Sequence, residues 1–409
     1  MVATRRAVLA GLGAAAWTGR VCAAPPAVQA ALDDAAGLAP AASLARLRPV
    51  KATTLRDRLD LEAARSGLAI QAEQARRFPP AAEQKAALIR LRDAGKPGAA
   101  RLPDGEVYLL LELRRQLGDW VALDAAEARL EAERRQVEAR AQRLFDGLGV
   151  APGPTGARYT ALWRDERYLY PDSDAGRAAA VVDMAATLAV LRPQVERACG
   201  FAAPPCTVRA LTPAEIAAGK GGFRTLPMGD RPGVYAVDLK DIRRRPRWTL
   251  TSVVAHELLP GHLLQLPIEA MTPPHPLRVA FTTGFPEGWG IYAETLAAGW
   301  GAYADPLAML GHLHWLLFRV ARAQVDLGIH RHGWLLAEAR ARLVAWQGEP
   351  AYFAPFDTDL ARIAVEPGAR AAEALAWLGI ADRARRHRNL RSFHRALLAG
   401  GRCRLEQLP

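Results

Sequence analysis

Apolar and charged positions follow a helical period through most of the first half of the chain. From about Ala27 to Phe145, apolar residues recur every three or four positions. In the stretch LLLELRRQLGDWVALDAAEARLEAERRQVEARAQRLF, charged residues also recur at i, i+4 spacing. This pattern predicts amphipathic helices that each bury one face. Residues 149–156, GVAPGPTG, predict a loop, and the segment AGRAAAVVDMAATLAVLRPQVERACG predicts a further helix closed by Gly200.

Two short segments, CTVRAL and GVYAVDL, alternate with a period of two and predict strands. The glycine-rich stretch between them, GKGGFRTLPMGDRPG, predicts a loop. Helical patterns then continue to nearly the end of the chain, with no internal repeat and no low-complexity linker. We therefore expect residues 25–409 to form one mostly α domain with a small β ribbon.

The N-terminal segment MVATRRAVLAGLGAAAWTGRVCAAPP has the pattern of an export signal. Arg5 and Arg6 precede a short apolar run, residues 7–17, and small residues follow near Cys22. Paired arginines before such a run resemble a twin-arginine signal, whereas the residues before Cys22 match a lipoprotein signal poorly. We expect residues 1–24 to be this signal and the mature chain to be periplasmic or secreted. The alternative is an N-terminal helix that frays.

Charge and hydropathy limit the classes of partner. The 409 residues carry a formal net charge of +12, and half of them are hydrophobic, as in ordinary globular proteins. The basic runs RRRPR and RARRHRNLR contain no interleaved aromatic residues, and no nucleic-acid motif accompanies them, so we expect no nucleic-acid partner. No segment after the signal offers 18 uninterrupted apolar residues, so we expect no stable membrane insertion.

Cys199 and Cys206 lie seven positions apart. In an oxidising compartment they could form a disulfide, and two unpaired buried thiols are the equally open alternative. The cysteines do not have the spacing of a zinc finger.

The stretch AHELLPGHLLQ contains the strongest sign of chemistry. His256 and His262 are six residues apart, which would turn the second side chain about 240° from the first in an unbroken helix and prevent chelation. Pro260 and Gly261 lie between them, and this pair tolerates a distortion that could add two residues and bring His262 beside His256. Glu257 follows His256 directly, where the general base of an H-E-x-x-H metal site lies.

A third metal ligand is predicted in the segment FPEGWGIYAETLAAG. Glu287 lies 25 residues after His262, which is enough for a loop and a returning helix. Glu294 is on the same helix face and could hydrogen-bond a ligand histidine. The alternatives are ordinary histidines near a helix end and an ordinary charge at a helix start.

A further face is predicted in RAQVDLGIHRHGW. Arg322, Asp326 and His330 follow one another at i, i+4 and i+8 and share one helix face. Asp326 could orient His330, Arg322 could pair with Asp326, and the face could bind a substrate carboxylate or polarise a carbonyl. The alternative is a structural ion-pair ladder.

Four segments, HELLPGHLLQ, EGWGIYAE, RPGVYAVDL and DLGIHRHGW, resemble the motifs of the bacterial domain-of-unknown-function 885 family. The family signature is H-E-x-x-P-G-H-x-x-Q followed by E-G-W-x-x-Y-x-E. The clear resemblance runs from about Arg224 to Trp334, and EPGARAAEALAWLG at 366–379 is a weaker match. The family is similar to helical zinc peptidases of the thimet-oligopeptidase and thermostable-carboxypeptidase types. The resemblance therefore implies a mostly α, gluzincin-like fold with a central channel.

By this resemblance, one zinc ion would be bound by His256, His262 and Glu287, and Glu257 would be the general base. The resemblance also implies that three other side chains stabilise an oxyanion or hold a substrate terminus: Arg231, Tyr235 and His330.

The chain departs from the family near its C-terminus. The family segment P-G-x-A-x-x-Y-x-x-G has Glu373 in place of its Tyr here, and Trp377 offers an aromatic ring in a shifted frame.

Three functions follow from these patterns. The leading hypothesis is an exported zinc hydrolase of short peptides or amides. The second is a family member that binds without turnover, which Glu373 favours and the intact Glu257 opposes. The third is a metal-dependent hydrolase of an ester or a non-peptide amide. The patterns predict no oligomeric state.

Overall fold

The computed structural model describes residues 27–409, so the predicted export signal at residues 1–24 lies outside the described residues. Helices hold 68% of these residues and strands 4%, which confirms a mostly α chain with a small β element. The helices are α1 (Ala27–Ala36), α2 (Pro40–Leu47), α3 (Leu55–Arg77), α4 (Ala81–Asp93), α5 (Gly105–Leu117), α6 (Leu123–Gly147), α7 (Thr155–Trp163), α8 (Asp174–Cys199), α9 (Pro213–Ala217), α10 (Leu250–Glu257), α11 (His262–Met271), α12 (Pro276–Ala280), α13 (Phe285–Gly299), α14 (Pro306–Arg331), α15 (Leu336–Gln347), α16 (Phe356–Ile363), α17 (Ala369–Arg386) and α18 (Leu390–Gly400).

Side-chain caps determine where several long helices begin. The Thr54 side chain accepts a hydrogen bond from a backbone N–H in the first turn of α3, and Ser173 and Asp305 do the same for α8 and α14. Each cap satisfies a donor that has no partner within its helix. Helix α8 ends at Gly200 with φ 72°, a left-handed conformation that favours glycine. The predicted helix and its closing glycine are thus confirmed.

A three-stranded sheet has the order β1-β3-β2. Strands β1 (Cys206–Ala210) and β3 (Gly233–Val237), both predicted, pair in parallel. Strand β2 (Phe223–Thr225) pairs antiparallel with β3 and lies inside the glycine-rich stretch predicted as a loop. The prediction missed it because three residues are too few to show an alternating pattern.

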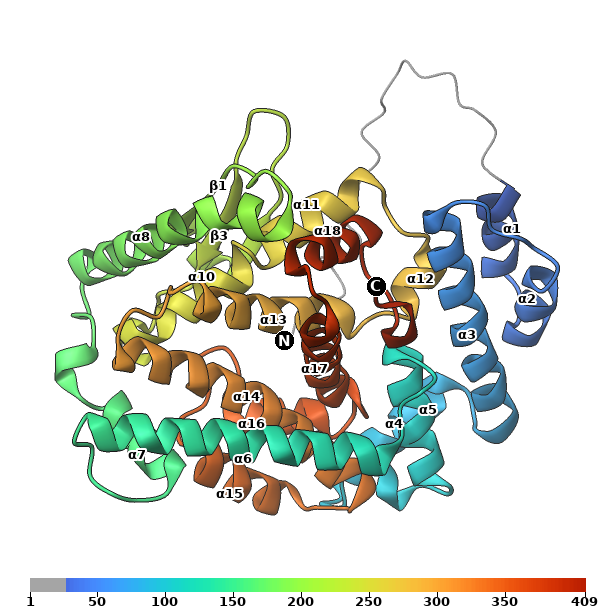
Figure 1. Ribbon diagram of the computed structural model, residues 1–409. Coiled ribbons are helices and arrows are strands. Elements are labelled where there is room, and N and C mark those ends of the chain that lie inside the picture. The colour runs from blue at the N-terminus through green and yellow to red at the C-terminus, as the bar shows by residue number, and fades with distance from the viewer. Residues whose placement is uncertain (1–26) are drawn as a thin grey trace.

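Helices α13, α14 and α17 form the centre of the molecule (Figure 1). Helix α13 packs against α10 and α17, while α14 packs against α6, α15 and α17. All residues of α14 from Leu310 to Ala323 are buried, so this helix has no solvent-facing polar stripe. Helices α1, α2 and α3 lie at one end of the molecule, and α7 and α8 lie at the other (Figure 1).

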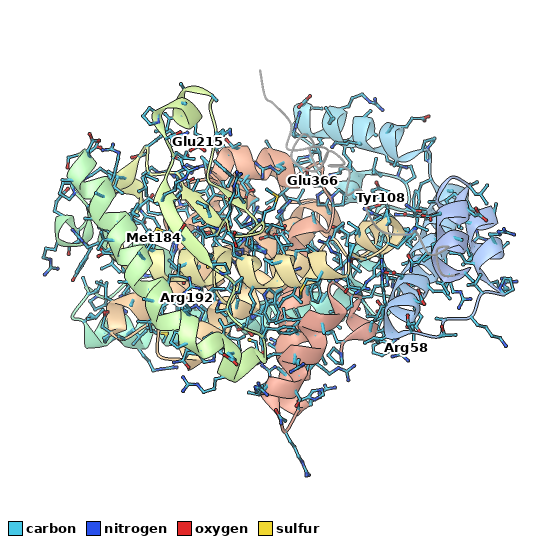
Figure 2. All side chains as sticks on the ribbon, turned by 90° about the horizontal axis from the view of Figure 1, so that it is seen from above. Arg58, Tyr108, Met184, Arg192, Glu215 and Glu366 are labelled. Atoms are coloured by element: carbon cyan, nitrogen blue, oxygen red, sulfur yellow. The ribbon has the colours of Figure 1, made fainter. Side chains whose placement is uncertain are left out.

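Among residues 27–409, α8 is the one helix long and apolar enough to cross a membrane by length and composition. Only 28% of its most apolar window is buried. Figure 2, in which Met184 and Arg192 mark this helix, shows it along the outside of the molecule. Its buried side packs against α10, α18 and β1. The absence of stable membrane insertion stays a prediction.

The structure has Cys199 and Cys206 as free, buried thiols, which is the second of the two alternatives for this pair. Burial raises the pKa of the Cys199 thiol to about 12, so it is neutral and unreactive at physiological pH.

Candidate metal centre

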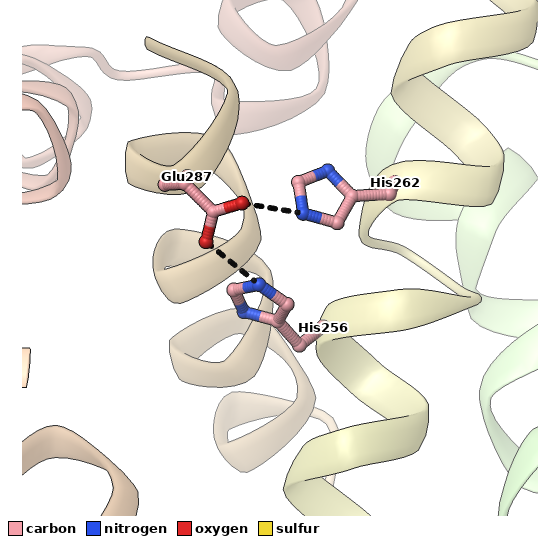
Figure 3. Close-up of side chains that lie close together, drawn as sticks. All are labelled: His256, His262 and Glu287. Carbon is pink, nitrogen blue, oxygen red and sulfur yellow. Dashed lines mark ion pairs between the residues drawn. The ribbon is translucent and has the colours of Figure 1, made fainter. Parts of the chain in front are cut away.

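Three of the predicted ligands meet at one point (Figure 3). His256 comes from the end of α10, His262 from the start of α11 and Glu287 from the first turn of α13, and their ligand atoms all lie within 4.8 Å of one another. The Glu287 carboxylate oxygens lie 3.4 Å from Nε2 of His256 and 3.6 Å from Nε2 of His262. Ligand atoms around a tetrahedral zinc ion, with bonds of about 2.0–2.2 Å, lie about 3.3–3.6 Å apart. The cluster could therefore hold a metal ion.

The six-residue spacing is accommodated by a break between two helices. Helix α10 ends at Glu257, Leu258 leaves the helix with φ −106° and ψ −101°, and α11 begins at His262. A Cβ atom at Gly261 would lie 1.9 Å from the backbone oxygen of His256, so the tight turn excludes a side chain there. The two imidazole centroids are 4.8 Å apart. The predicted approach of the histidines is confirmed, although a helix break replaces the predicted distortion.

The motif EGWG supports the cluster from the side of α13. The Trp289 indole N–H donates a hydrogen bond to the carbonyl oxygen of Pro260 at 3.1 Å, which ties the break to α13. A Cβ atom at Gly290 would lie 2.5 Å from the His256 ring. The glycine therefore provides the space that lets His256 approach Glu287.

Glu294 orients the first histidine, as predicted. Its carboxylate is hydrogen-bonded to Nδ1 of His256 at 2.9 Å, and both groups are buried. Nε2, the other ring nitrogen, faces Glu287 at 3.4 Å, and this arrangement is typical of metal-ligating histidines.

His262 carries the most direct sign of a missing partner. It is 1% exposed, Nδ1 has no hydrogen-bond partner among residues 27–409, and Nε2 lies 3.6 Å from the Glu287 carboxylate, too far for a hydrogen bond. Burying an imidazole without partners costs free energy. A cation at the cluster would give Nε2 a partner, so the donor set fits a metal.

The protonation of the cluster also fits a cation site. Burial and the charge of Arg319 act to lower the pKa of His256, but hydrogen bonds with Glu287 and Glu294 outweigh them and raise it to about 9. Burial lowers the pKa of His262. Burial acts to raise the pKa of Glu287, but the two histidines beside it hold the pKa well below the usual value. A metal ion would therefore have to replace the proton on His256.

Glu257 forms an ion pair with Arg224 of β2. Burial acts to raise the pKa of Glu257, but the charges of Arg224, His256 and His262 together outweigh it and hold the pKa below its usual value. Glu257 is therefore ionised at neutral pH. The sequence did not identify Arg224, because its segment was predicted as a loop. No sequence pattern marked it, because its position follows from the pairing of β2 with β3.

Arg319 of α14 is a second residue that the sequence did not identify. Its Nη2 lies 3.4 Å from Nε2 of His256, and its Nη1 lies 3.6 Å from the Glu287 carboxylate. An arginine within the apolar run LLFRVA was the available signal. Its guanidinium competes with a cation for the same two ligands.

A cavity of about 730 Å³ lies beside His256 and Glu257. This volume falls within the range of about 300–1,000 Å³ that is typical of small-ligand sites. The cavity is lined by glycines, aromatic rings and charged side chains: Gly219, Gly221, Gly222, Tyr235, Asp238, Lys240, Arg245, Ser252, Val253, Glu294, Trp315, Arg319, Tyr352, Phe353, Arg362, Glu366 and Arg370.

The two residues predicted from RPGVY have different positions. Tyr235 is buried and lines the cavity, and burial raises the pKa of its hydroxyl, which is therefore neutral. Arg231 is exposed, its backbone forms an isolated bridge with Met228, and it does not line the cavity.

The structure does not bring His330 to the cluster. The ring is fully buried, Nδ1 accepts a hydrogen bond from the Ala99 backbone N–H at 2.9 Å, and Nε2 donates to the Ile363 carbonyl at 2.8 Å. Asp326 lies 3.8 Å from Nε2, but the backbone groups orient the ring instead. No ring nitrogen is left for a substrate, so the structure corrects the predicted catalytic use of His330.

The other two residues of that face also have different partners from those predicted. Arg322 forms a two-point ion pair with Asp359 at 2.6 and 2.8 Å, not with Asp326. Asp326 accepts hydrogen bonds from three backbone N–H groups in the first turn of α17, at 2.8–3.1 Å. Arg322 and Asp326 do not line the cavity. The shared face joins α14 to α16 and α17. It is therefore neither the predicted substrate-binding face nor the predicted ion-pair ladder within one helix.

The chain belongs to the bacterial family of proteins of unknown function DUF885, whose model matches residues 3–409. No curated protein matches the chain.

Two solved structures share the fold. The first is a "putative lipoprotein" from Colwellia psychrerythraea, with a TM-score of 0.69 at 23% identity, over 93% of this chain and 71% of that one. The second, a "putative lipoprotein of unknown function" from Shewanella oneidensis, has a TM-score of 0.62 at 15% identity, over 94% of this chain and 73% of that one. At these identities the likeness shows the fold alone.

Proposed function

We propose that this chain is a zinc-dependent hydrolase that cleaves peptide or amide bonds in short substrates. The observation that carries the proposal is the meeting of His256, His262 and Glu287, with neither nitrogen of the buried His262 hydrogen-bonded within residues 27–409. Two imidazoles and one carboxylate, with a fourth position open, form a typical donor set of catalytic zinc. Zinc in such a site polarises a carbonyl oxygen and lowers the pKa of a bound water.

Glu257 is the proposed general base. It is ionised, it lines the cavity beside the metal ligands, and it belongs to the helix end that carries His256. A carboxylate held in this position can take a proton from an attacking water and later pass it to the leaving amine. The ion pair with Arg224 holds Glu257 in the charged form that this role requires.

Arg319 and Tyr235 are the proposed stabilisers of negative charge that develops on the substrate. Both line the cavity, and the buried Tyr235 hydroxyl stays protonated because burial raises its pKa. Preorganised donors of this kind stabilise a developing oxyanion.

The proposed function includes a fold and a cellular location. A gluzincin-like arrangement with a channel that admits short peptides would agree with the cavity beside His256. Export through a twin-arginine-type signal, followed by a periplasmic or secreted location, is part of the same proposal. The two solved neighbours, described as lipoproteins, support an exported protein.

A binding protein without turnover is the second candidate. It is favoured by the position of Arg319, whose guanidinium faces Nε2 of His256 at 3.4 Å. In such a protein the Arg319 guanidinium would occupy the place of the metal ion. Glu373, which replaces the Tyr of the family segment, also favours a binding protein.

A hydrolase of esters or non-peptide amides is the third candidate.

The test combines metal content and turnover. The mature chain is expected to bind about one zinc ion by mass spectrometry, and His262→Ala is expected to bind almost none. Glu257→Gln should keep zinc but lose hydrolysis of short peptides by about 100-fold or more. Parent chain that takes up no zinc when zinc is supplied would overturn the hydrolase proposal in favour of the binding protein. Zinc without peptide cleavage, but with ester cleavage, would identify the third candidate.

A further inference from the structure

The cavity beside the metal cluster contains a buried cation with no carboxylate partner. Among its basic lining residues, Lys240, Arg319 and Arg370 each have a carboxylate within 3.0–3.6 Å. Arg362 has none among residues 27–409, but it is partly exposed and can be solvated. Arg245 also has none, although it is only 3% exposed.

Arg245 has further unsatisfied donors. Its Nε and Nη2 have no hydrogen-bond partner within the described part of the chain. Burying a charge without a partner is strongly unfavourable, and natural proteins break this rule mainly at functional sites. The same pair of donors in Arg322 binds the Asp359 carboxylate at two points. Among the described residues, Arg245 therefore has no negative charge beside it, and a carboxylate that enters the cavity lined by this residue would supply one.

The surroundings of Arg245 link it to the proposed catalytic residues. Its guanidinium lies 3.4 Å from the centre of the Tyr352 ring, and both residues line the cavity. Arg245, Tyr235 and Glu257 all line the same cavity. A substrate that fills it can therefore contact Arg245 and the proposed base at the same time.

The cavity also has an apolar wall. The Trp315 and Phe353 rings are stacked with centroids 5.9 Å apart and an interplanar angle of 12°, and both line the cavity. Such a wall accepts an apolar side chain.

We propose that the cavity selects substrates with a free carboxylate, which Arg245 binds, next to an apolar side chain that packs against Trp315 and Phe353. This proposal rests on the proposed hydrolase function, because it describes the substrate of that site, but binding of the carboxylate can be measured without turnover. The carboxylate can come from a C-terminal residue or from an acidic side chain.

The experiment measures peptide binding by calorimetry to the full mature chain, with zinc and after zinc removal. The probes are acetyl-Ala-Ala-Phe as the free acid, its C-terminal amide, and acetyl-Ala-Asp-Phe amide. The free acid should bind about tenfold or more tightly than the amide, as expected for a charge-assisted hydrogen bond. Comparable binding of the Asp-containing amide would identify an acidic side chain as an accepted source.

Two variants and one control locate the effect. Arg245→Gln should abolish the preference for the free acid, and Arg245→Lys should keep part of it because the charge is retained. Lys240→Gln is the matched control: it removes one charge from the cavity lining, but that charge already pairs with Asp238, so the preference should survive. Unfolding curves check that each variant is folded.

Two results would overturn the inference: equal binding of the free acid and both amides by the parent, or an unchanged preference in folded Arg245→Gln. Selective carboxylate binding without any hydrolysis would contradict the proposed function and leave the carboxylate site standing.

Discussion

At the scale of single residues, Arg319 is a cation placed against two metal ligands. Replacing it in Arg319→Gln removes a positive charge close to the metal position, so the zinc affinity should rise by about tenfold or more. Turnover should fall by about 100-fold, because a donor to the developing oxyanion is lost. Zinc affinity is measured by competition with a chelator, and turnover is measured at saturating zinc.

Arg342→Gln is the control for Arg319→Gln, because Arg342 lies on the exposed surface of α15 and pairs with Glu338. A fall in zinc affinity in Arg319→Gln would show that the guanidinium supports the ligands instead of competing with the metal.

The proton on His256 makes a prediction about pH. Because hydrogen bonds raise the pKa of His256 to about 9, the ring is protonated at neutral pH, and zinc must displace one proton. Zinc affinity should therefore rise about tenfold per pH unit between pH 7 and 8.5, after correction for the chelator. A histidine with its ordinary pKa of about 6.5 would give an affinity that is nearly constant over this range.

Glu294→Gln is the partner experiment for this pH dependence. It removes the charge of one of the two carboxylates that raise the pKa of His256. The rise in zinc affinity should then level off at a lower pH than in the parent. An identical pH profile in both proteins would contradict the assignment of the proton to His256.

At the scale of elements, the close approach of α10 and α13 depends on Gly290. Gly290→Ala places a methyl group about where the His256 ring lies, so the ring must move and zinc affinity should fall by about 10–100-fold. Gly299→Ala in the same helix is the matched control, because a Cβ atom there meets nothing within 4 Å. Chelator competition measures both, and equal zinc affinities would show that His256 has room to spare.

The elements also show how far the sequence could lead. Glu287 and Glu294 were predictable as neighbours on one helix face from their spacing. The two histidines were predictable as a pair from the Pro-Gly between them and from the family resemblance. The break after Glu257 was predictable only as a distortion, since Pro260 and Gly261 interrupt a helix without specifying its new direction. Arg319 was not predictable, because its contacts with His256 and Glu287 depend on how α14 packs against two other helices.

At the scale of the whole molecule, buried polar side chains of α14 join distant parts of the chain. Asp326 binds the first turn of α17, and Arg322 binds Asp359 in α16. The helical spacing correctly placed Arg322, Asp326 and His330 on one face, but we predicted a catalytic or substrate-binding role for them. The helical pattern does not show which residues of other segments will pair with that face. These contacts hold the wall of the cavity, which includes Glu366 and Arg370, against the helix that carries Arg319.

His330 tests this structural role directly. His330→Ala removes a buried ring that bridges the Ala99 N–H and the Ile363 carbonyl, so the free energy of unfolding should fall by about 2–4 kcal/mol. Zinc stoichiometry and turnover at a temperature where the variant is folded should stay within about twofold of the parent. His332→Ala, in a side chain that is 41% exposed, should change the free energy of unfolding by no more than about 0.5 kcal/mol. Urea unfolding measures both. A large loss of turnover in folded His330→Ala protein would contradict this structural role. It would show that His330 acts in catalysis and that the catalytic site extends along α14 beyond Arg319.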